Sequence, residues 1–400
     1  MNVVFAIIGL ILLFIIWLVL DFSLGKKKHL ACSAQMETPI LHGDLEIFPH
    51  GKKLFQDYFA EIRAAKNHVH VLFYIIKNDA FSLEFFQLLK EKAREGVEVR
   101  LLVDRLGGLK VKKAEVHALT QAGVQFAYCN QVRFPYLFYT SQVRNHRKIS
   151  IIDGKIGYLG GFNIGKEYID QDPKLCPWRD YHLKMTGEGV NFLQSEFFID
   201  WRLAAGEDLQ RDPGYFPKLP QGSIRHRLVP TEAGQLEGRQ IRLIRQAERA
   251  IIIGSPYFIP SKKLFSELIE ALRRGVSLTI LTPYTADHPL VQEASFRFLR
   301  VLLQEGAQVY QYKKGFYHAK VIVVDDKICD VGTANFDNRS FFLNKEINCY
   351  IYDRQFIERL MAILNKDILD SEPLSLDKLN KPSLARSLKE AAAKALTFFL

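Results

Sequence analysis

Two stretches of the chain carry the same reactive side chains at the same spacing. Each contains His-x-Lys-x4-Asp, and the six residues of this candidate catalytic set are His146, Lys148, Asp153, His318, Lys320 and Asp325. Each stretch then runs through an apolar segment to a turn of small residues that ends in Asn163 or Asn335, at the same distance from its histidine. One such match would be weak evidence, but two matching copies predict a duplicated catalytic site.

These residue types favour chemistry on a phosphoryl group. The lysine ammonium has no free lone pair at neutral pH, so a His-Lys pair argues against a metal site and for an anion site. Histidine can act as nucleophile, base or acid near pH 7, while lysine and asparagine can bind phosphoryl oxygens. Two facing copies would give one histidine to attack phosphorus and one to protonate the leaving oxygen. We therefore expect double-displacement phosphoryl transfer without metal or cofactor, with Asn163 and Asn335 binding the substrate.

We expect β-strands to position these side chains, because successive side chains on a strand point to alternate faces. Residues two apart on a strand point to the same face, so the His and Lys of each copy should project together. The segments that follow, 149–152 and 321–324, are apolar and mostly β-branched, which is typical of buried strands. Asp153 and Asp325 come where these strands end, so we interpret both carboxylates as structural groups of a turn rather than as proton carriers.

Helical and strand patterns alternate in the same order in the two halves of the chain. The predicted fold class is α/β, with duplicated domains at 40–205 and 238–370, each a mixed β-sheet flanked by helices. Residues 206–237 are rich in Pro, Gly and charge and are interpreted as a linker. The tail, 371–400, has apolar residues at helical spacing and could form an amphipathic helix.

Several further stretches repeat a known pattern. They are GGFNIGKEY at 160–168, WRD at 178–180, SPYFIP at 255–260, NFDNRS at 335–340 and NKE at 344–346. With the two motifs, they resemble the phospholipase D superfamily, and within it the bacterial cardiolipin synthases. The resemblance implies phospholipase D-type domains and an enzyme that transfers a phosphatidyl group between two phosphatidylglycerol molecules, releasing glycerol. The alternatives are a phospholipase D or phosphatidyltransferase that uses water or another alcohol and, ranked lower, a nucleic-acid phosphodiesterase.

The resemblance also suggests roles for individual residues. His146 would be the nucleophile that forms a phosphohistidine, and His318 the acid that protonates departing glycerol and then the base for the incoming hydroxyl. The repeats are nearly symmetric, so the reverse assignment stays open. Glu167 and Glu346 match the carboxylates that orient each histidine, although both could also be solvated surface charges.

An unbroken apolar run at 3–20 is long enough to nearly span a hydrocarbon core as a helix. Three lysines follow at 26–28 and no basic residue precedes the run. This pattern favours a retained anchor, here 1–25, over a cleaved signal peptide. The positive-inside rule then predicts a single-pass cell-membrane protein with its catalytic body in the cytoplasm. An apolar-aromatic cluster at 134–139 could dip into the membrane interface or pack in the core.

The composition narrows the choice of partners. The formal charge of +10 suits anionic lipid and nucleic acid equally well, but the anchor favours phosphatidylglycerol and other anionic membrane lipids, with no nucleic acid expected. The five cysteines are odd in number and scattered without a CxxC pair, which indicates neither a zinc site nor a disulfide framework. No sequence feature indicates an oligomeric state.

Overall fold

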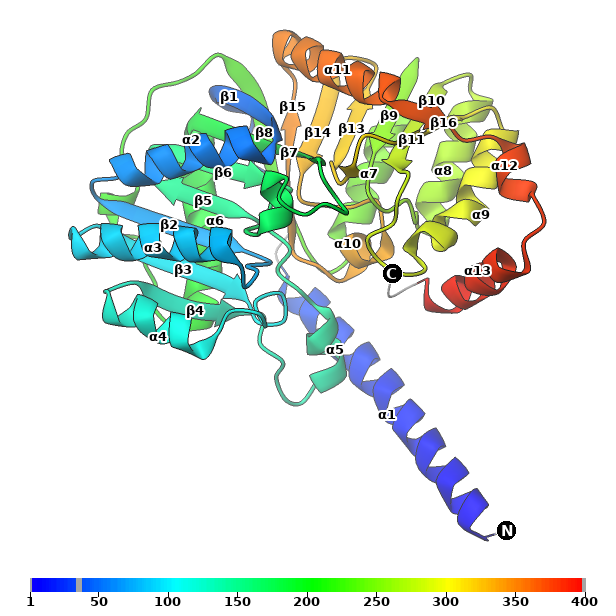
Figure 1. The fold of residues 1–400 in the computed structure, drawn as a ribbon, viewed down its shortest axis with the longest axis horizontal. Coiled ribbons are helices and arrows are strands. Elements are labelled where there is room, and N and C mark those ends of the chain that lie inside the picture. Colours follow the sequence, from blue (N-terminus) through cyan, green and yellow to red (C-terminus); the bar gives the residue numbers. More distant parts are fainter. Residues whose placement is uncertain (1, 34–37, 398–400) are drawn as a thin grey trace.

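A single β-sheet runs through the whole body of the protein. The structure, a computed structural model, describes residues 2–33 and 38–397. Its strands follow the order β16-β11-β10-β9-β13-β14-β15-β8-β1-β7-β6-β5-β2-β3-β4, with β12 paired to β7. Figure 1 shows the first half of the chain at one end of this sheet and the second half at the other, with β15, β8, β1 and β7 near the middle.

The first half contains parallel and antiparallel strands. Its strands are β1 (Leu41–His50), β2 (His68–Phe73), β3 (Glu98–Asp104), β4 (Gln125–Cys129), β5 (Ile149–Ile152), β6 (Ile156–Gly160) and β7 (Trp178–Gly187). Its helices are α2 (Gly51–Ala64), α3 (Ala80–Arg94), α4 (Lys113–Gln121), α5 (Leu137–Gln142), the 3-10 turn η1 (Lys166–Ile169) and α6 (Glu188–Ala205). Strands β2, β3 and β4 are parallel, whereas β5, β6 and β7 are antiparallel neighbours.

The second half repeats this arrangement. Its strands are β8 (Ile224–Thr231), β9 (Ala250–Gly254), β10 (Ser277–Pro283), β11 (Gln308–Tyr312), β12 (Phe316–Tyr317), β13 (Val321–Val324), β14 (Ile328–Gly332), β15 (Glu346–Ile351) and β16 (Ser371–Pro373). Its helices are α7 (Gln235–Arg245), α8 (Lys262–Arg273), α9 (Val291–Gln304), α10 (Asn338–Phe342), α11 (Arg354–Leu369), α12 (Leu376–Asn380) and α13 (Leu384–Leu396). Strands β9, β10 and β11 are parallel, and β13, β14 and β15 are antiparallel. The predicted α/β fold with duplicated mixed sheets is therefore confirmed, and the two sheets are joined into one.

The middle of the chain is more regular than a linker. The sequence predicts a linker at 206–237, but β8 lies within it and pairs antiparallel with β1 and β15. Its buried side chains include Ile224, His226 and Leu228, the alternation of a sheet strand. The Pro- and Gly-rich flanks hide this alternation in the sequence. The stretch before β8, with the short turn η2 (Pro213–Tyr215), and the turn at 232–234 are connections, whereas β8 and the start of α7 are regular, so the linker prediction needs this correction.

Helices cover both faces of the sheet and make a three-layer body. On one face, α6 and α11 pack on a core that is continuous across both halves. On the other face, α2 and α3 cover the first half, while α7, α8 and α9 cover the second. Strand β13 is buried on both faces, because Val321 and Val323 join the first core while Ile322 and Val324 join another. This packing fixes the strand that follows the second motif's His and Lys.

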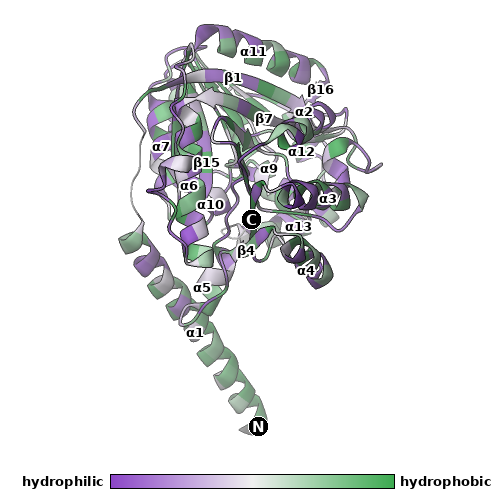
Figure 2. Ribbon diagram, turned by 90° about the vertical axis from the view of Figure 1, so that its left-hand side faces the viewer, coloured by the Kyte–Doolittle hydropathy of each residue, from purple (hydrophilic) through white to green (hydrophobic). Residues whose placement is uncertain are grey.

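Helix α1 (Asn2–Cys32) projects from the body and continues past the predicted end of the anchor at residue 25. Its stretch Val3–Cys32 is the one described helix long and apolar enough to cross a membrane, with a best window of mean hydropathy 3.3 that is 0% buried. Figure 2 shows hydrophobic residues along the free end of α1 and mixed residues where the helix meets the body. The apolar run therefore has no packing partner within the described chain.

The last turns of α1 dock on α5. The Asp21 carboxylate accepts a hydrogen bond from the Tyr139 backbone N–H at 2.7 Å, and His29 Nδ1 lies 2.7 Å from the Tyr139 hydroxyl oxygen. Gly25 permits this approach, because a Cβ there would lie 2.7 Å from the Tyr139 side chain. Since α5 leads directly into the first motif, α1 is fixed to the chain segment beside that motif.

The helix predicted in the tail is α13, and it packs on α9. Arg300 and Glu390 form an ion pair with an N–O distance of 2.7 Å, and Ala393 is fully buried. Leu384 and Leu388, by contrast, are 84% and 67% exposed. Residues 398–400 of the predicted tail lie outside the described residues. The helix thus docks on the body with one face and leaves leucines on another.

Candidate active site

Both motif histidines line one cavity of about 570 Å³ at the seam between the two halves. His146 and His318 are 8% and 7% exposed, so each is packed in the body yet open to this cavity. Its polar and aromatic lining also includes Tyr74, Lys77, Asn163, Glu167, Tyr168, Trp178, Tyr257, Asp287, His288, Asn335, Asp337, Arg339 and Asn344. The duplication therefore brings both histidines and both predicted substrate-binding asparagines to one place.

Each motif is attached to the backbone of the opposite half. The His146 backbone N–H donates to the Lys345 carbonyl at 2.9 Å, and the Lys345 N–H donates to the Arg144 carbonyl at 2.8 Å. On the other side, β12 pairs in parallel with β7, and the His318 N–H donates to the Arg179 carbonyl at 2.6 Å. These reciprocal attachments set the distance between the motifs by main-chain hydrogen bonds.

Glu346 of the second half orients His146 of the first. His146 Nδ1 lies 3.0 Å from both Glu346 carboxylate oxygens, which leaves Nε2 for a ligand. The hydroxyls of Thr333 and Ser340 donate to Glu346 at 2.6 and 2.8 Å. Burial lowers the pKa of His146, and the charge of Glu346 opposes this effect. Burial alone would raise the pKa of Glu346, but the charges of His146 and Lys148 hold it below its usual range.

Asp180 of the first half orients His318 of the second. His318 Nδ1 lies 2.6 Å from Asp180 Oδ2, and the Tyr181 N–H donates to the other carboxylate oxygen at 2.7 Å. Lys320 Nζ lies 2.5 Å from His318 Nδ1 and 3.4 Å from Asp180 Oδ2. Burial, followed by the charge of Lys320, lowers the pKa of His318 to about 4, against the opposing effect of Asp180. With this pKa, the imidazole is neutral at pH 7.

The two orienting carboxylates occupy equivalent strand positions. Gly160 pairs with His182 and Gly332 pairs with Asn348 across the matching β6–β7 and β14–β15 ladders. Asp180 and Glu346 each precede that ladder partner by the same number of residues. Equivalence is thus set by strand register, although the chain between the Asn turn and this strand differs in length between the halves.

Glu167 is not the carboxylate that orients His318. It lines the cavity, but its carboxylate forms an ion pair with Lys77 Nζ at 2.9 Å. The physical reason is that Glu167 belongs to η1, which is inserted between the Asn163 turn and β7, whereas Asp180 lies on β7 itself. The sequence signal for Asp180 is the WRD stretch at 178–180 read with the strand register, and not its distance from Asn163.

The two lysines are buried beside the histidines and place positive charge there. Lys148 Nζ donates to the His146 carbonyl at 2.6 Å, and Lys320 also donates to the His318 carbonyl. Burial lowers the pKa of Lys148 to about 7, although Glu346 opposes the shift. Burial likewise lowers the pKa of Lys320 against the charge of Asp180. The charge of Lys320 contributes to the lowered pKa values of both His146 and Lys148, so the halves interact electrostatically across the seam.

The two asparagines differ in how their amides are used. Asn163 Oδ1 accepts from the Ile75 N–H at 3.1 Å, and Asn163 Nδ2 donates to the Tyr168 hydroxyl at 3.2 Å. Asn335 Oδ1 is buried without a hydrogen-bond partner among the described residues. The unsatisfied atom is the amide oxygen, which accepts hydrogen bonds, so Asn335 is open to a ligand group that donates, such as a hydroxyl.

Asp153 and Asp325 tie down the ends of the motif strands. Asp153 accepts from the backbone N–H groups of Lys66, Asn67 and His68 at 2.9, 2.7 and 3.0 Å. Asp325 makes the equivalent bonds to the N–H groups of Glu248, Arg249 and Ala250 at 2.9, 2.8 and 2.9 Å. Both have a positive φ, 52° and 54°, and neither lines the catalytic cavity within the described chain. They hold strands together and cannot touch a bound phosphate there.

Aromatic rings flank the histidines. The Tyr74 ring lies edge-on to His146 with 4.9 Å between centroids, and Trp178 lies 4.9 Å from His318. Tyr257 also lines the cavity, 6.2 Å from His318, whereas its neighbour Phe258 is buried against Phe336. No sequence motif marks Tyr74, although the residue directly follows the buried strand β2. These rings pack against the imidazoles, which still line the cavity.

The chain is similar to several known proteins. Residues 58–175 and 240–368 match the family described as cardiolipin synthase, PLD-like domain. The chain is 40% identical over 400 residues to the minor cardiolipin synthase ClsB of Bacillus subtilis (strain 168), covering 100% of both chains. It is 37% identical over 361 residues to the major cardiolipin synthase ClsA of the same organism, covering 88% of this chain and 74% of the relative.

A solved structure shares the fold. The crystal structure of phosphatidylserine synthase from Haemophilus influenzae Rd KW20 superposes with a TM-score of 0.72 at 17% identity, covering 90% of this chain and 97% of that one. The two regions matched by the family description contain the two motifs that meet in the catalytic cavity. The chain therefore belongs to the cardiolipin synthases of the phospholipase D superfamily and is an enzyme of the phosphatidyltransferase type.

Proposed function

We propose that this enzyme makes cardiolipin and glycerol from two phosphatidylglycerol molecules through a phosphohistidine intermediate. The observation that carries the proposal is that two histidines line one cavity, each with a carboxylate from the opposite half on its Nδ1. Such a pair leaves His146 Nε2 to attack one phosphorus, while His318 Nε2, 3.3 Å from Lys320 Nζ, would handle the proton. The choice of His146 as the nucleophile follows the family resemblance.

In the first step, His146 Nε2 attacks the phosphorus of phosphatidylglycerol. A nitrogen–phosphorus bond forms, the bond from phosphorus to the glycerol oxygen breaks, and His318 gives its proton to that oxygen. The pKa of His318 is lowered to about 4, and an anionic phosphodiester beside it would raise that pKa and favour the protonated imidazole. Lys148, Lys320 and the amides of Asn163 and Asn335 hold the non-bridging oxygens as charge redistributes.

In the second step, the glycerol hydroxyl of another phosphatidylglycerol attacks the phosphohistidine. His318 takes the hydroxyl proton, the new oxygen–phosphorus bond forms and the nitrogen–phosphorus bond breaks, which releases cardiolipin and restores both imidazoles. The apolar side chains of Leu175, Trp178 and Val291 on the cavity wall suit glycerol and acyl carbons better than water. This lining supports an alcohol acceptor over hydrolysis.

Product analysis tests the proposal. The purified full-length enzyme is given phosphatidylglycerol vesicles, and lipid products and free glycerol are quantified. Cardiolipin with equimolar glycerol is expected, whereas phosphatidic acid alone would show that water is the acceptor. Cleavage of oligonucleotides without lipid turnover would move the protein to the nucleases. Quenching in alkali, because phosphohistidine is labile in acid, followed by peptide mapping would show which histidine carries the phosphate.

We also propose that α1 spans the membrane and that the catalytic body is cytoplasmic. The lysines at 26–28 follow the apolar run, and the run is exposed on all sides of the helix. Exposed Cys176 offers a natural probe on the body. A membrane-impermeant maleimide should label Cys176 in inverted membrane vesicles and spare it in right-side-out cells; labelling of intact cells would reverse the orientation.

A further inference from the structure

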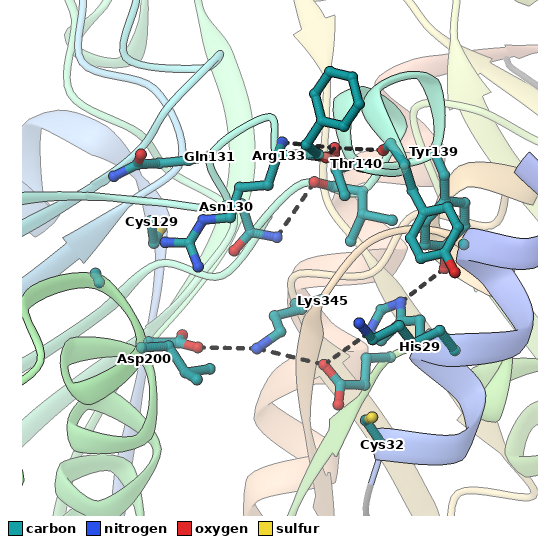
Figure 3. Close-up of a pocket in the computed structure, with 18 of the residues that line it drawn as sticks. His29, Cys32, Cys129, Asn130, Gln131, Arg133, Tyr139, Thr140, Asp200 and Lys345 are labelled. Atoms are coloured by element: carbon teal, nitrogen blue, oxygen red, sulfur yellow. Dashed lines mark hydrogen bonds and ion pairs between the residues drawn. The ribbon is translucent and has the colours of Figure 1, made fainter. Parts of the chain in front are cut away.

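A second cavity, of about 480 Å³, lies where α1 meets the body. Figure 3 shows His29 and Cys32 of α1 on one side of it, and Asp200 and Lys345 on another. It is separate from the catalytic cavity but adjoins it through Lys345, which lines this cavity while its neighbour Glu346 binds His146. The mechanism above uses none of its side chains.

The mouth of this cavity is apolar. Phe134 and Leu203 line it and are 83% and 58% exposed, and Pro135, Tyr136 and Val143 add further apolar surface. Of the aromatic cluster at 134–139, Tyr139 is buried and packs against α1, whereas Phe134 points away from any core. One end of the cluster therefore packs in the core and the other is exposed, and the sequence allows both. The exposed end borders the cavity next to α1.

The charges in the cavity divide into a paired and an unpaired set. Lys345 pairs with Asp200 and Glu232 at 3.1 and 3.4 Å, and Glu232 also lies 3.5 Å from His29. Both carboxylates in the lining are thus already engaged, Asp200 by Arg147 as well. Arg133 and Lys28, in contrast, have no carboxylate within ion-pair distance among the described residues, and Figure 3 shows the Arg133 side chain directed into the cavity.

We propose that this cavity binds one anionic glycerophospholipid from the leaflet that surrounds α1. The phosphate would lie at Arg133 and Lys28, and an acyl chain would follow Phe134 and Leu203 towards the membrane. A zwitterionic lipid lacks the net negative charge that two unpaired cations attract, and soluble phosphate lacks the chain that the apolar mouth fits. The inference rests on the proposed membrane insertion of α1, but not on the proposed reaction.

Photo-crosslinking tests the site directly. The full-length His146→Asn protein, which cannot turn the lipid over, is placed in phosphatidylcholine nanodiscs that contain phosphatidylglycerol with a photoreactive acyl chain. After irradiation, adducts are mapped by peptide mass spectrometry. We expect adducts on peptides that contain residues 129–143 and 200–204, and their suppression by unlabelled phosphatidylglycerol. Adducts around residues 256–291 would report the catalytic cavity independently.

Matched variants distinguish an effect of the Arg133 charge on lipid binding from an effect on folding. Arg133→Glu should lower adduct yield at 129–143 and 200–204 about tenfold, because it replaces attraction by repulsion next to the headgroup. Arg133→Lys should retain most of the yield, as should Arg211→Glu, which reverses an exposed arginine outside the cavity. Equal yield from Arg133→Glu, equal labelling by photoreactive phosphatidylcholine, or full competition by inorganic phosphate would each overturn the proposal. If adducts form at 129–143 and 200–204 but not around 256–291, the second cavity binds lipid and the catalytic cavity does not. That result would count against the proposed reaction and not against this site.

Discussion

The His146 site and the His318 site differ most in where the lysine lies. Both lysines donate to the carbonyl of their histidine, but Lys320 also lies 2.5 Å from His318 Nδ1 and 3.4 Å from Asp180 Oδ2. The closer ammonium is one reason why the pKa of His318 falls to about 4. Two copies of one motif can therefore have different proton affinities, because surroundings rather than residue types set the pKa.

Replacing the histidines should cause the largest loss of activity and should show that the two histidines have different roles. His146→Asn and His318→Asn should each lower kcat by at least about 10³-fold on phosphatidylglycerol, since both steps need both imidazoles. A phosphatidyl ester of p-nitrophenol has a leaving group that needs no proton. His318→Asn should still form the phosphoenzyme from it, measured as a burst of nitrophenol, and His146→Asn should not. A burst from His146→Asn alone would exchange the two roles.

Neutralising the orienting carboxylates should sharpen the difference in pH dependence. Asp180→Asn and Glu346→Gln should each lower kcat by about 10²-fold. Each carboxylate raises the pKa of its histidine, so its removal lowers that pKa further. Glu346→Gln should therefore shift the acid limb of the kcat–pH profile to lower pH, because the nucleophile loses its proton earlier. Asp180→Asn should shift the alkaline limb to lower pH, because His318, the general acid, then loses its proton at lower pH.

Glu167→Gln is the control for these carboxylate variants. It removes a cavity charge of the same type, but one that pairs with Lys77 and does not hold a histidine. Its kcat should stay within about threefold of the parent value, as expected for a charge that is not part of the orienting pair. A loss as large as that of Asp180→Asn would restore Glu167 as a positioning residue.

Lys148 should cost stability in a pH-dependent way. Its pKa is about 7 in the folded protein against an ordinary value of 10.5. Between these values the unfolded chain binds a proton that the folded protein does not, so the free energy of unfolding rises with pH across this window. Lys148→Met should unfold at a higher temperature than the parent at about pH 6, with the gap shrinking towards about pH 10. Thermal unfolding in detergent measures this, and a gap independent of pH would contradict the assigned pKa.

The motif aspartates should show the smallest effect on catalysis. Asp153→Asn and Asp325→Asn each weaken three hydrogen bonds to backbone N–H groups, so each should lower the free energy of unfolding by about 2 kcal/mol. Below the unfolding temperature, kcat should remain within about twofold of the parent value. Measuring both quantities on the same preparations separates the roles, and a large loss of kcat in a fully folded variant would make either aspartate functional.

Sequence patterns predict most of this fold, because most helices, strands and turns depend on residues that are close together in the sequence. The duplicated motif, the apolar strands after it and the Asn turns predict the His-Lys pairs, the mixed sheets and the structural role given to Asp153 and Asp325. Asp180 was missed because its equivalence to Glu346 is a matter of sheet register, which residue spacing does not carry. Strand β8 was missed because its partners, β1 and β15, come from opposite halves of the chain.

The exchange of carboxylates between the halves has a consequence for how the protein can change. Asp180 contacts the imidazole of the other repeat, and Glu346 does the same in return, so a mutation at either carboxylate should impair the opposite histidine. Neither repeat should therefore be able to lose its function while the other repeat stays active. A chain severed in the 206–223 connection should accordingly yield two inert fragments whose activity returns only when they are mixed.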